Sequence, residues 1–322
     1  MRPTTRRAFA LSLAATLGAP AVLRAQTKTT RLVIAFPPGG PVDFVGRTLG
    51  EQLGRELGHP VIVENRAGAN GAIAAEFVSR ATPDATTLWL TSVGAVAINP
   101  VLYDKLAYDP VRDLVPVSLV VNNVEVLVVP ANAPYSTGAE FVAAARQPGA
   151  RLSMASSGTG SVPHLALELL NDAAKTSILH VPYKGAAPAI TDVIAGHVQG
   201  FFGDIPGLIG HIKAGKLKAI GIAAAKRHPV LPDVRTFEEM GVPGVDSDNW
   251  YGLFTSRGTP AADAERVASA VRKALGNTDV HNKLLASGAQ PAASTPAELA
   301  ALLRKDTAKW GAVVRAKNIK AE

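Results

Sequence analysis

Short apolar runs alternate along this chain with segments whose apolar residues recur every three or four positions. Arg31–Phe36 predicts a strand, and the proline- and glycine-rich segment 37–41 ends it. Val42, Val45, Leu49, Leu53 and Leu57 then fall on one face of a helix, which Gly58 ends. A strand at Val61–Glu64 follows. This alternation is typical of βαβ units, so the sequence predicts an α/β fold built on parallel sheets.

The same alternation continues to the end of the chain and restarts near Val124. Further predicted strands are Thr87–Ser92, Val115–Val121, Val124–Pro130, Leu152–Ser156, Ile178–Val181, Val198–Phe202, Leu217–Ala223 and Trp250–Thr255. Predicted helices include His164–Ala173, a short one at Thr236–Met240, and a C-terminal one that begins with a capping box at Thr295–Glu298. For 322 residues this restart indicates two domains.

The first 25 residues have the order of a secretory signal. Arg6-Arg7 precede a weakly polar stretch from Ala8 to Leu23, which ends at Arg24-Ala25. The Thr5–Phe9 segment also resembles a twin-arginine export signal. Cleavage fits after Ala25 or after Ala21, and the alternative is an uncleaved anchor. We expect a soluble mature protein, because no later segment is long and apolar enough to cross a bilayer.

Charge and cysteine usage exclude several classes of function. Lys and Arg exceed Asp and Glu by 7, but four arginines and no acids lie in residues 1–25, so the excess over 26–322 is 3. Without a basic block, nucleic acid is not an expected partner. The chain has no cysteine, which rules out disulfides, thiolate metal sites and cysteine nucleophiles.

Two loops share one form: a strand end, glycines or serines, a proline, and then a helix. They are Pro38–Pro41 and Ser157–Pro163, one in each half of the chain. A helix N-terminus has unpaired N–H groups and a partial positive charge, and glycine lets a ligand approach the backbone. Two such loops facing one another would hold a small anion; the alternative is that both are ordinary strand-to-helix turns.

Enzymatic motifs are absent from the sequence. It has no phosphate loop, no Gly-x-Gly-x-x-Gly and no Gly-x-Ser-x-Gly, and its seven histidines never take the spacing of a zinc-binding helix. We therefore expect no metal and no cofactor. Ser161, His164 and Asp204 form the one imaginable triad, which keeps a serine hydrolase using Ser161 or Ser156 as an alternative.

Several segments resemble the Bug family, the periplasmic substrate-binding proteins of tripartite tricarboxylate transporters. The similar segments, in the family's order, are Phe36–Asp43, Val63–Gly71, Ser156–Leu165, His180–Gly185, and Trp250–Phe254 followed by Gly258–Pro260. The resemblance implies a two-lobed type II periplasmic-binding-protein fold, a "Venus flytrap" of two doubly wound sheets joined by hinge strands. Lobe 1 would be residues 26–124 plus 250–322, and lobe 2 residues 125–249.

The resemblance also implies a ligand and a set of contacts. The ligand would be a small carboxylated or aromatic-acid metabolite, held by backbone N–H groups and water and passed to membrane permease subunits by a periplasmic monomer. A ligand sensor for a signalling protein is the alternative. The implied contacts are Gly39, Gly40, Pro41, Gly68, Ala69 and Ser92 from lobe 1, and Ser156, Gly160, Ser161 and Asp204 from lobe 2.

Other polar residues near these loops have structural explanations. We expect Asp43 to bind the N–H groups at its helix start and Arg66 to pair with an acid such as Glu64. Tyr183, Trp250 and Tyr251 are expected to pack at the junction of the lobes, and His164 and Lys184 are left open between structure and ligand contact.

Overall fold

A computed structural model describes residues 28–320, and the predicted signal segment 1–25 lies outside them. Ten strands form one continuous sheet in the order β2-β1-β3-β9-β4-β7-β5-β6, with β8 and β10 also paired to β4. The strands are β1 (Thr30–Ile34), β2 (Val61–Asn65), β3 (Thr87–Ser92), β4 (Leu114–Pro130), β5 (Ser153–Ser156), β6 (Leu179–Pro182), β7 (Gly200–Asp204), β8 (Leu217–Ile222), β9 (Asp248–Ser256) and β10 (Gln290–Pro291). The strands β1–β3 are parallel to one another, as are β5–β7, whereas β4 and β9 run antiparallel to their neighbours.

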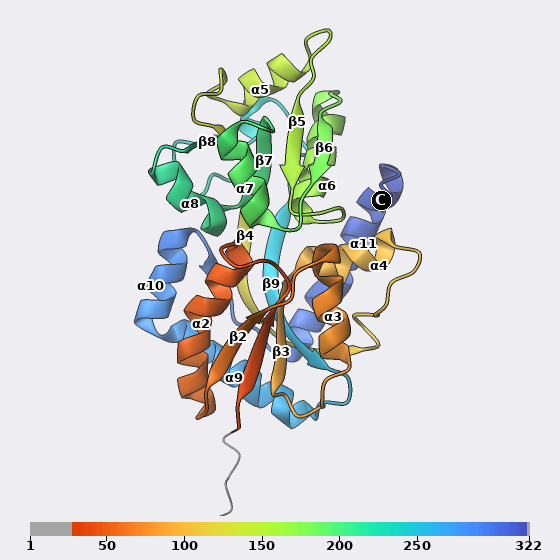
Figure 1. The fold of residues 1–322 in the computed structure, drawn as a ribbon, viewed down its shortest axis with the longest axis vertical. Helices are drawn as coiled ribbons and strands as arrows, with labels where there is room; N and C mark the ends of the chain where they lie inside the picture. The colour runs from red at the N-terminus through yellow and green to blue at the C-terminus, as the bar shows by residue number, and fades with distance from the viewer. Residues whose placement is uncertain (1–27, 321–322) are drawn as a thin grey trace, which may run out of the picture.

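Helices cover both ends of this sheet (Figure 1). They are α2 (Pro41–Leu57), α3 (Ala72–Ser79), α4 (Asn99–Leu102), α5 (Gly138–Ala145), α6 (Val162–Ala174), α7 (Ala186–Ala195), α8 (Ile205–Lys213), α9 (Ala261–Gly276), α10 (Thr278–Ser287) and α11 (Pro296–Ala316). The local predictions for two of them are confirmed. Val45, Leu49 and Leu53 of α2 are fully buried and Gly58 ends the helix in the left-handed region, while Thr295 and Glu298 form the capping box of α11.

The buried side chains form three clusters, one mostly in the first lobe and two in the second, and Val162 and Leu165 of α6 join the cluster of the first lobe. In the first lobe, one core joins residues of β1, β3 and α2 to residues of β9, α9 and α11. In the second lobe, one core packs α5 and α6 on the sheet and another packs α7 and α8 on it. The second lobe therefore has helices on both faces of its sheet, as parallel strands require, and β4 and β9 pass between the lobes (Figure 1).

One predicted break in the chain is wrong. The separate strands expected at Val115–Val121 and Val124–Pro130 are a single strand, β4. Asn122 and Asn123, which separate the two predicted strands, both stay in the ladder, opposite Trp250 and Asn249 of β9. The sequence also gave no indication of the π-helix Gly94–Ile98, which runs into α4. The two predicted sheets are therefore continuous through β4.

The short helix expected at Thr236–Met240 is a 3-10 turn over Glu238–Met240, and a second such turn spans Ala69–Gly71. No helix within residues 28–320 has the length and apolar character to cross a membrane.

Candidate functional site

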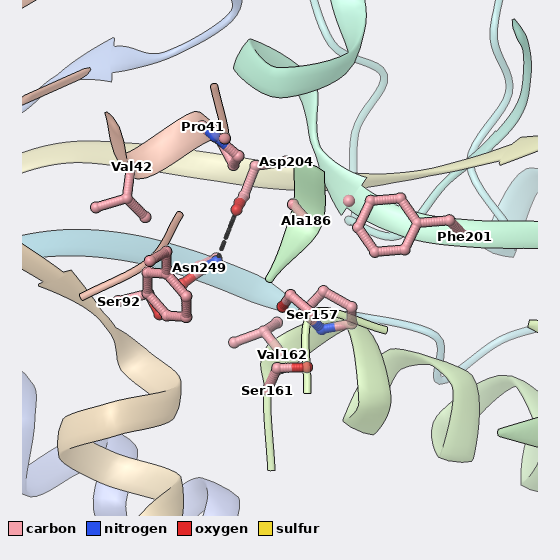
Figure 2. A pocket seen from close by; sticks show the side chains of 14 residues that line it. Pro41, Val42, Ser92, Ser157, Ser161, Val162, Ala186, Phe201, Asp204 and Asn249 are labelled. Atoms are coloured by element: carbon pink, nitrogen blue, oxygen red, sulfur yellow. Dashed lines mark hydrogen bonds between the residues drawn. The ribbon is translucent and has the colours of Figure 1, made fainter. Parts of the chain in front are cut away.

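A pocket lies between the two lobes, with about 420 Å³ of empty space that includes its opening to solvent (Figure 2). The first lobe and the second lobe both contribute to its wall, and Asn249 of β9 lies between them. The lining residues are Phe36, Gly40, Pro41, Val42, Ser92, Ser157, Ser161, Val162, Pro163, Ala186, Phe201, Gly203, Asp204 and Asn249.

Several helices begin at this pocket. Gly40 is the N-cap of α2, Ser161 of α6 and Gly185 of α7, and the residue after each N-cap lines the pocket. The first N–H groups of a helix have no partner within it, and the helix dipole adds partial positive charge there. No Lys or Arg occurs among the lining residues of the described chain. The pocket is therefore suited to a small anion held by backbone N–H groups rather than by a cationic side chain.

The structure brings five of the ten predicted contact residues to this pocket. Gly40, Pro41 and Ser92 line it from the first lobe, and Ser161 and Asp204 from the second. The Ser161 hydroxyl also accepts a bond from the His164 backbone N–H at 3.4 Å, which caps α6.

The other five predicted residues lie beside the pocket rather than in its wall. The Gly39 N–H donates to Asp43 at 3.0 Å. Ser156 is fully buried, with its hydroxyl 2.7 Å from His180 Nε2, and the Gly160 N–H donates to His164 Nδ1 at 3.2 Å. These polar groups are thus bonded within the protein, and their residues are not part of the pocket wall.

Gly68 and Ala69 line a second cavity between the lobes. Its empty space is about 690 Å³, and it shares Phe36 and Ser157 with the first pocket. Lys184 also lines this second cavity. Because two wall residues are common to both cavities, the second cavity adjoins the first between the lobes.

Sequence reasoning missed Ser157, Asn249 and the apolar walls Phe36, Val42, Ala186 and Phe201. Ser157 belongs to the predicted glycine-rich loop, so its signal was present but was assigned to its neighbours Ser156 and Ser161. Asn249 gave no signal, because its position depends on how β9 crosses between the lobes.

Asp43 and Arg66 have the structural roles expected from the sequence. Asp43 accepts bonds from the Gly39 N–H, Arg47 and Asn65. Arg66 lies 2.5 Å from Glu64 and stacks over Phe77, with 3.7 Å from the guanidinium carbon to the ring centre. Tyr183 donates to Asp192, whereas Trp250 and Tyr251 are buried where β9 crosses.

Asp204 belongs to a buried cluster at the floor of the pocket. The Asn249 amide donates to it at 3.0 Å, and the Tyr251 hydroxyl donates to its other oxygen. Glu125 lies opposite Asp204 in the β4–β7 ladder and accepts from Asn249 at 3.4 Å. Burial raises the pKa of Asp204 to about 6, and burial together with the Asp204 charge raises the pKa of Glu125 well above its ordinary value.

This acid pair should make the protein less stable as the pH rises. Between the ordinary carboxyl pKa and the raised one, the folded state binds protons that the unfolded state has lost, so the free energy of unfolding falls across that window. Glu125→Gln keeps the shape and removes one of the two acids. In urea unfolding near pH 5 and near pH 8, the variant should lose less stability than the parent over this interval. Glu51→Gln, exposed on α2, is the control, and a slope unchanged by Glu125→Gln would contradict the prediction.

The imagined catalytic triad does not form. His164 accepts from the Gly160 N–H and stacks on His180 with 3.8 Å between ring centres. Burial lowers the pKa of His164 to about 3. Asp204 bonds to Asn249 and Tyr251 rather than to a histidine. The Ser161 hydroxyl accepts from the His164 backbone N–H rather than pairing with a histidine ring, whereas Ser156, which lies 2.7 Å from His180 Nε2, is fully buried and outside the pocket wall. Neither serine therefore forms the arrangement of nucleophile, base and orienting acid that catalysis on a ligand in the pocket needs. In residues 28–320, no cluster of three metal-ligating side chains is present.

Comparisons with known proteins agree with this geometry. Residues 45–319 match the family described as "Tripartite tricarboxylate transporter family receptor". The structure is similar to MatC from Rhodopseudomonas palustris with bound malate, at 34% identity and a TM-score of 0.84, covering 89% of this chain and 98% of that one. It is also similar to an R. palustris protein with adipate, at 30% identity and a TM-score of 0.88 over 92% and 99% of the two chains.

The periplasmic binding protein BugD is a third similar structure. It has 28% identity and a TM-score of 0.87, with 91% of this chain and 99% of that chain covered. The fold class expected from the resemblance, a two-lobed type II periplasmic-binding-protein fold, is thus confirmed. The family and the fold are those of substrate-binding receptors and not of enzymes. This chain belongs to the Bug family, the receptors of tripartite tricarboxylate transporters.

Proposed function

We propose that this chain is exported to the periplasm, captures a small organic acid between its two lobes, and delivers it to the membrane subunits of a tripartite tricarboxylate transporter. The family match and the similarity to a periplasmic binding protein support the location and the partner. The N-terminal pattern of Arg6-Arg7 and an apolar run supports export.

The observation that carries the ligand class is the meeting of three helix starts at one pocket. The N-termini of α2, α6 and α7 come from both lobes and offer N–H groups and partial positive charge to the same space. A carboxylate is one of the metabolite groups that such donors bind. The bound malate of MatC and the adipate of the R. palustris protein are small acids of this kind.

The proposed receptor closes by rotating its lobes about β4 and β9. We assign residues 26–124 and 250–322 to one lobe and 125–249 to the other, because the chain passes between them only near these positions in the described residues. A ligand that contacts both lobes favours the closed form, since it makes all its bonds only there. Gly40 and Ser161, on opposite lobes, would be the paired contacts.

Thermal unfolding of residues 26–322 against a panel of acids tests this function. The panel contains mono-, di- and tricarboxylates, aromatic acids and amino acids. A ligand at 100 times its dissociation constant adds about 2.7 kcal/mol of stability and should raise the melting temperature by several degrees. The matched control for each acid is its neutral amide, which should give no shift.

Two results would contradict the proposal. One is no shift with any acid and no small molecule released, by mass spectrometry, on denaturing the purified protein. The other concerns delivery. Deleting this gene should reduce uptake by the host of the acid that raises the melting temperature, and restoring the parent gene should restore that uptake. Unchanged uptake would remove the transport role while leaving the binding role.

A further inference from the structure

Asp204 is the one acid among the described residues that line this pocket. It lies at the end of β7, lines the pocket and is 7% exposed. It occupies the N-cap position of α8, but its side chain makes no capping bond there. Its carboxylate instead lies at the pocket floor, where Figure 2 shows it on the Pro41 side, across Asn249 from Ser157 and Ser161.

The Asp204 carboxylate retains capacity to accept a further hydrogen bond. Asn249 and Tyr251 donate one group each, Asn249 with 3.0 and 3.1 Å to the two oxygens. An ionised carboxylate offers about four lone-pair sites, so these two donors do not fill it. Because Asp204 lines the pocket, a ligand there can reach this remaining capacity.

The surroundings of Asp204 disfavour a second anion beside it. Glu125 of β4 is the other acid facing it, and Tyr251 and Asn249 of β9 are neutral donors. The positive dipole ends near it are the start of α8, where Asp204 is the N-cap, and the start of α2 at Pro41, on whose side Figure 2 shows it. No cationic side chain lines this pocket within the described chain. A ligand carboxylate placed against Asp204 would therefore meet like charge in a buried site, which costs binding energy.

We propose that the ligand carries a hydrogen-bond donor, a hydroxyl or an ammonium group, close to the carboxylate that the helix starts hold, and that Asp204 accepts from this donor. This inference rests on the proposed function and narrows it from small acids in general to acids with a donor near one carboxylate. The alternative is that Asp204 only links β7 to β9 through its bonds with Asn249 and Tyr251. In that case a hydrogen-bond donor on the ligand would not change the affinity.

Isothermal titration with matched ligand sets separates the two readings. The sets are succinate, L-malate and L-aspartate; glutarate, 2-hydroxyglutarate and L-glutamate; and 3-phenylpropanoate, 3-phenyllactate and L-phenylalanine. Near pH 7.5, within the set that binds, a donor-bearing acid should bind at least about tenfold tighter than its plain parent, as expected for a bond to a charged acceptor. Comparing the affinities of the hydroxy acid and the amino acid in each set shows whether the protein prefers a hydroxyl or an ammonium donor.

Two further measurements assign the preference to Asp204. Asp204→Asn should reduce the preference to less than about threefold, whereas Asp263→Asn, the same change on the exposed face of α9, should keep it. The parent protein should also lose the preference near pH 5, because the pKa of Asp204 is about 6 and its protonated form donates as well as accepts. This second readout holds even if Asp204→Asn fails to fold.

The outcomes distinguish this inference from the function on which it rests. Equal or tighter binding of the plain acid, or a preference that neither Asp204→Asn nor low pH reduces, overturns the inference and leaves a carboxylate receptor. No binding by any member of any set, together with no shift in the wider panel, overturns both.

Discussion

Gly40→Val should weaken binding of the captured acid by about a hundredfold while the protein stays folded. Gly40 begins α2 in extended backbone, with φ −83° and ψ 173°, a conformation that valine adopts readily. An added Cβ would have the Pro37 carbonyl oxygen, at 3.6 Å, as its one neighbour within 4 Å. The branched side chain would therefore not strain the fold, but would stand over the N–H groups at the start of α2.

The magnitude follows from the bonds that the valine would block. A hydrogen bond to a charged group contributes about 1.5–3 kcal/mol, so losing one or two such bonds corresponds to roughly a hundredfold in affinity. Titration of the acid that gives the largest thermal shift measures it, with melting temperature as the check on folding. Gly210→Val is the matched control, because a Cβ at Gly210 has no neighbour within 4 Å and Gly210 does not line the pocket. Parental affinity in Gly40→Val would show that the start of α2 does not hold the ligand.

Gly207→Ala should lower affinity by at least about tenfold without lowering the stability of the ligand-free protein. Gly207 is in the first turn of α8, on the second lobe, and a Cβ there would lie 2.9 Å from Pro41 Cδ and 3.3 Å from Pro41 Cβ on the first lobe. Proline is rigid and begins α2, so the lobes would have to move apart. Within α8 itself, alanine is favoured over glycine by up to about 1 kcal/mol. The substitution should therefore oppose closure of the lobes, through the contact with Pro41, while stabilising α8 in the folded protein.

Gly210→Ala is the control for this second variant. It makes the same chemical change one helical turn later, where an added Cβ meets nothing within 4 Å. We expect it to keep the parental affinity and to melt at the same temperature or higher. Small-angle scattering with saturating acid should show Gly207→Ala more extended than Gly210→Ala. Equal affinity and equal dimensions for the two alanine variants would contradict closure through the contact between α2 and α8.

The local elements could be predicted because their causes are local. The apolar spacing from Val42 to Leu53 and the glycine at 58 were enough for α2, and Thr295 with Glu298 were enough for the start of α11. The two helix starts that follow strand ends, at Pro38–Pro41 and Ser157–Pro163, could also be predicted from short segments, and residues of both segments line the pocket.

What could not be predicted depends on residues far apart in the sequence. Asn249 reaches Asp204 across 45 positions and Glu125 across 124, so no local pattern reports their meeting. In the loop after β5, the sequence also could not show which serines line the pocket and which are buried inside the protein. Ser157 and Ser161 line the pocket while Ser156 contacts His180, and that division depends on the neighbouring strand β6.

The position of Asn249 has a consequence for the order in which a ligand is recognised. It lies in β9, opposite Asn123 of β4, where the two strands pass from one lobe to the other. Atoms near a rotation axis move least, so in the proposed closure about β4 and β9 Asn249 and the Asp204 carboxylate that it binds would keep nearly the same relative position whether the lobes are apart or together. The helix starts lie farther from the axis and travel more. Under the proposed closure, a ligand would thus contact Asn249 and Asp204 first, at nearly fixed positions, and the helix starts of the two lobes would close on it afterwards.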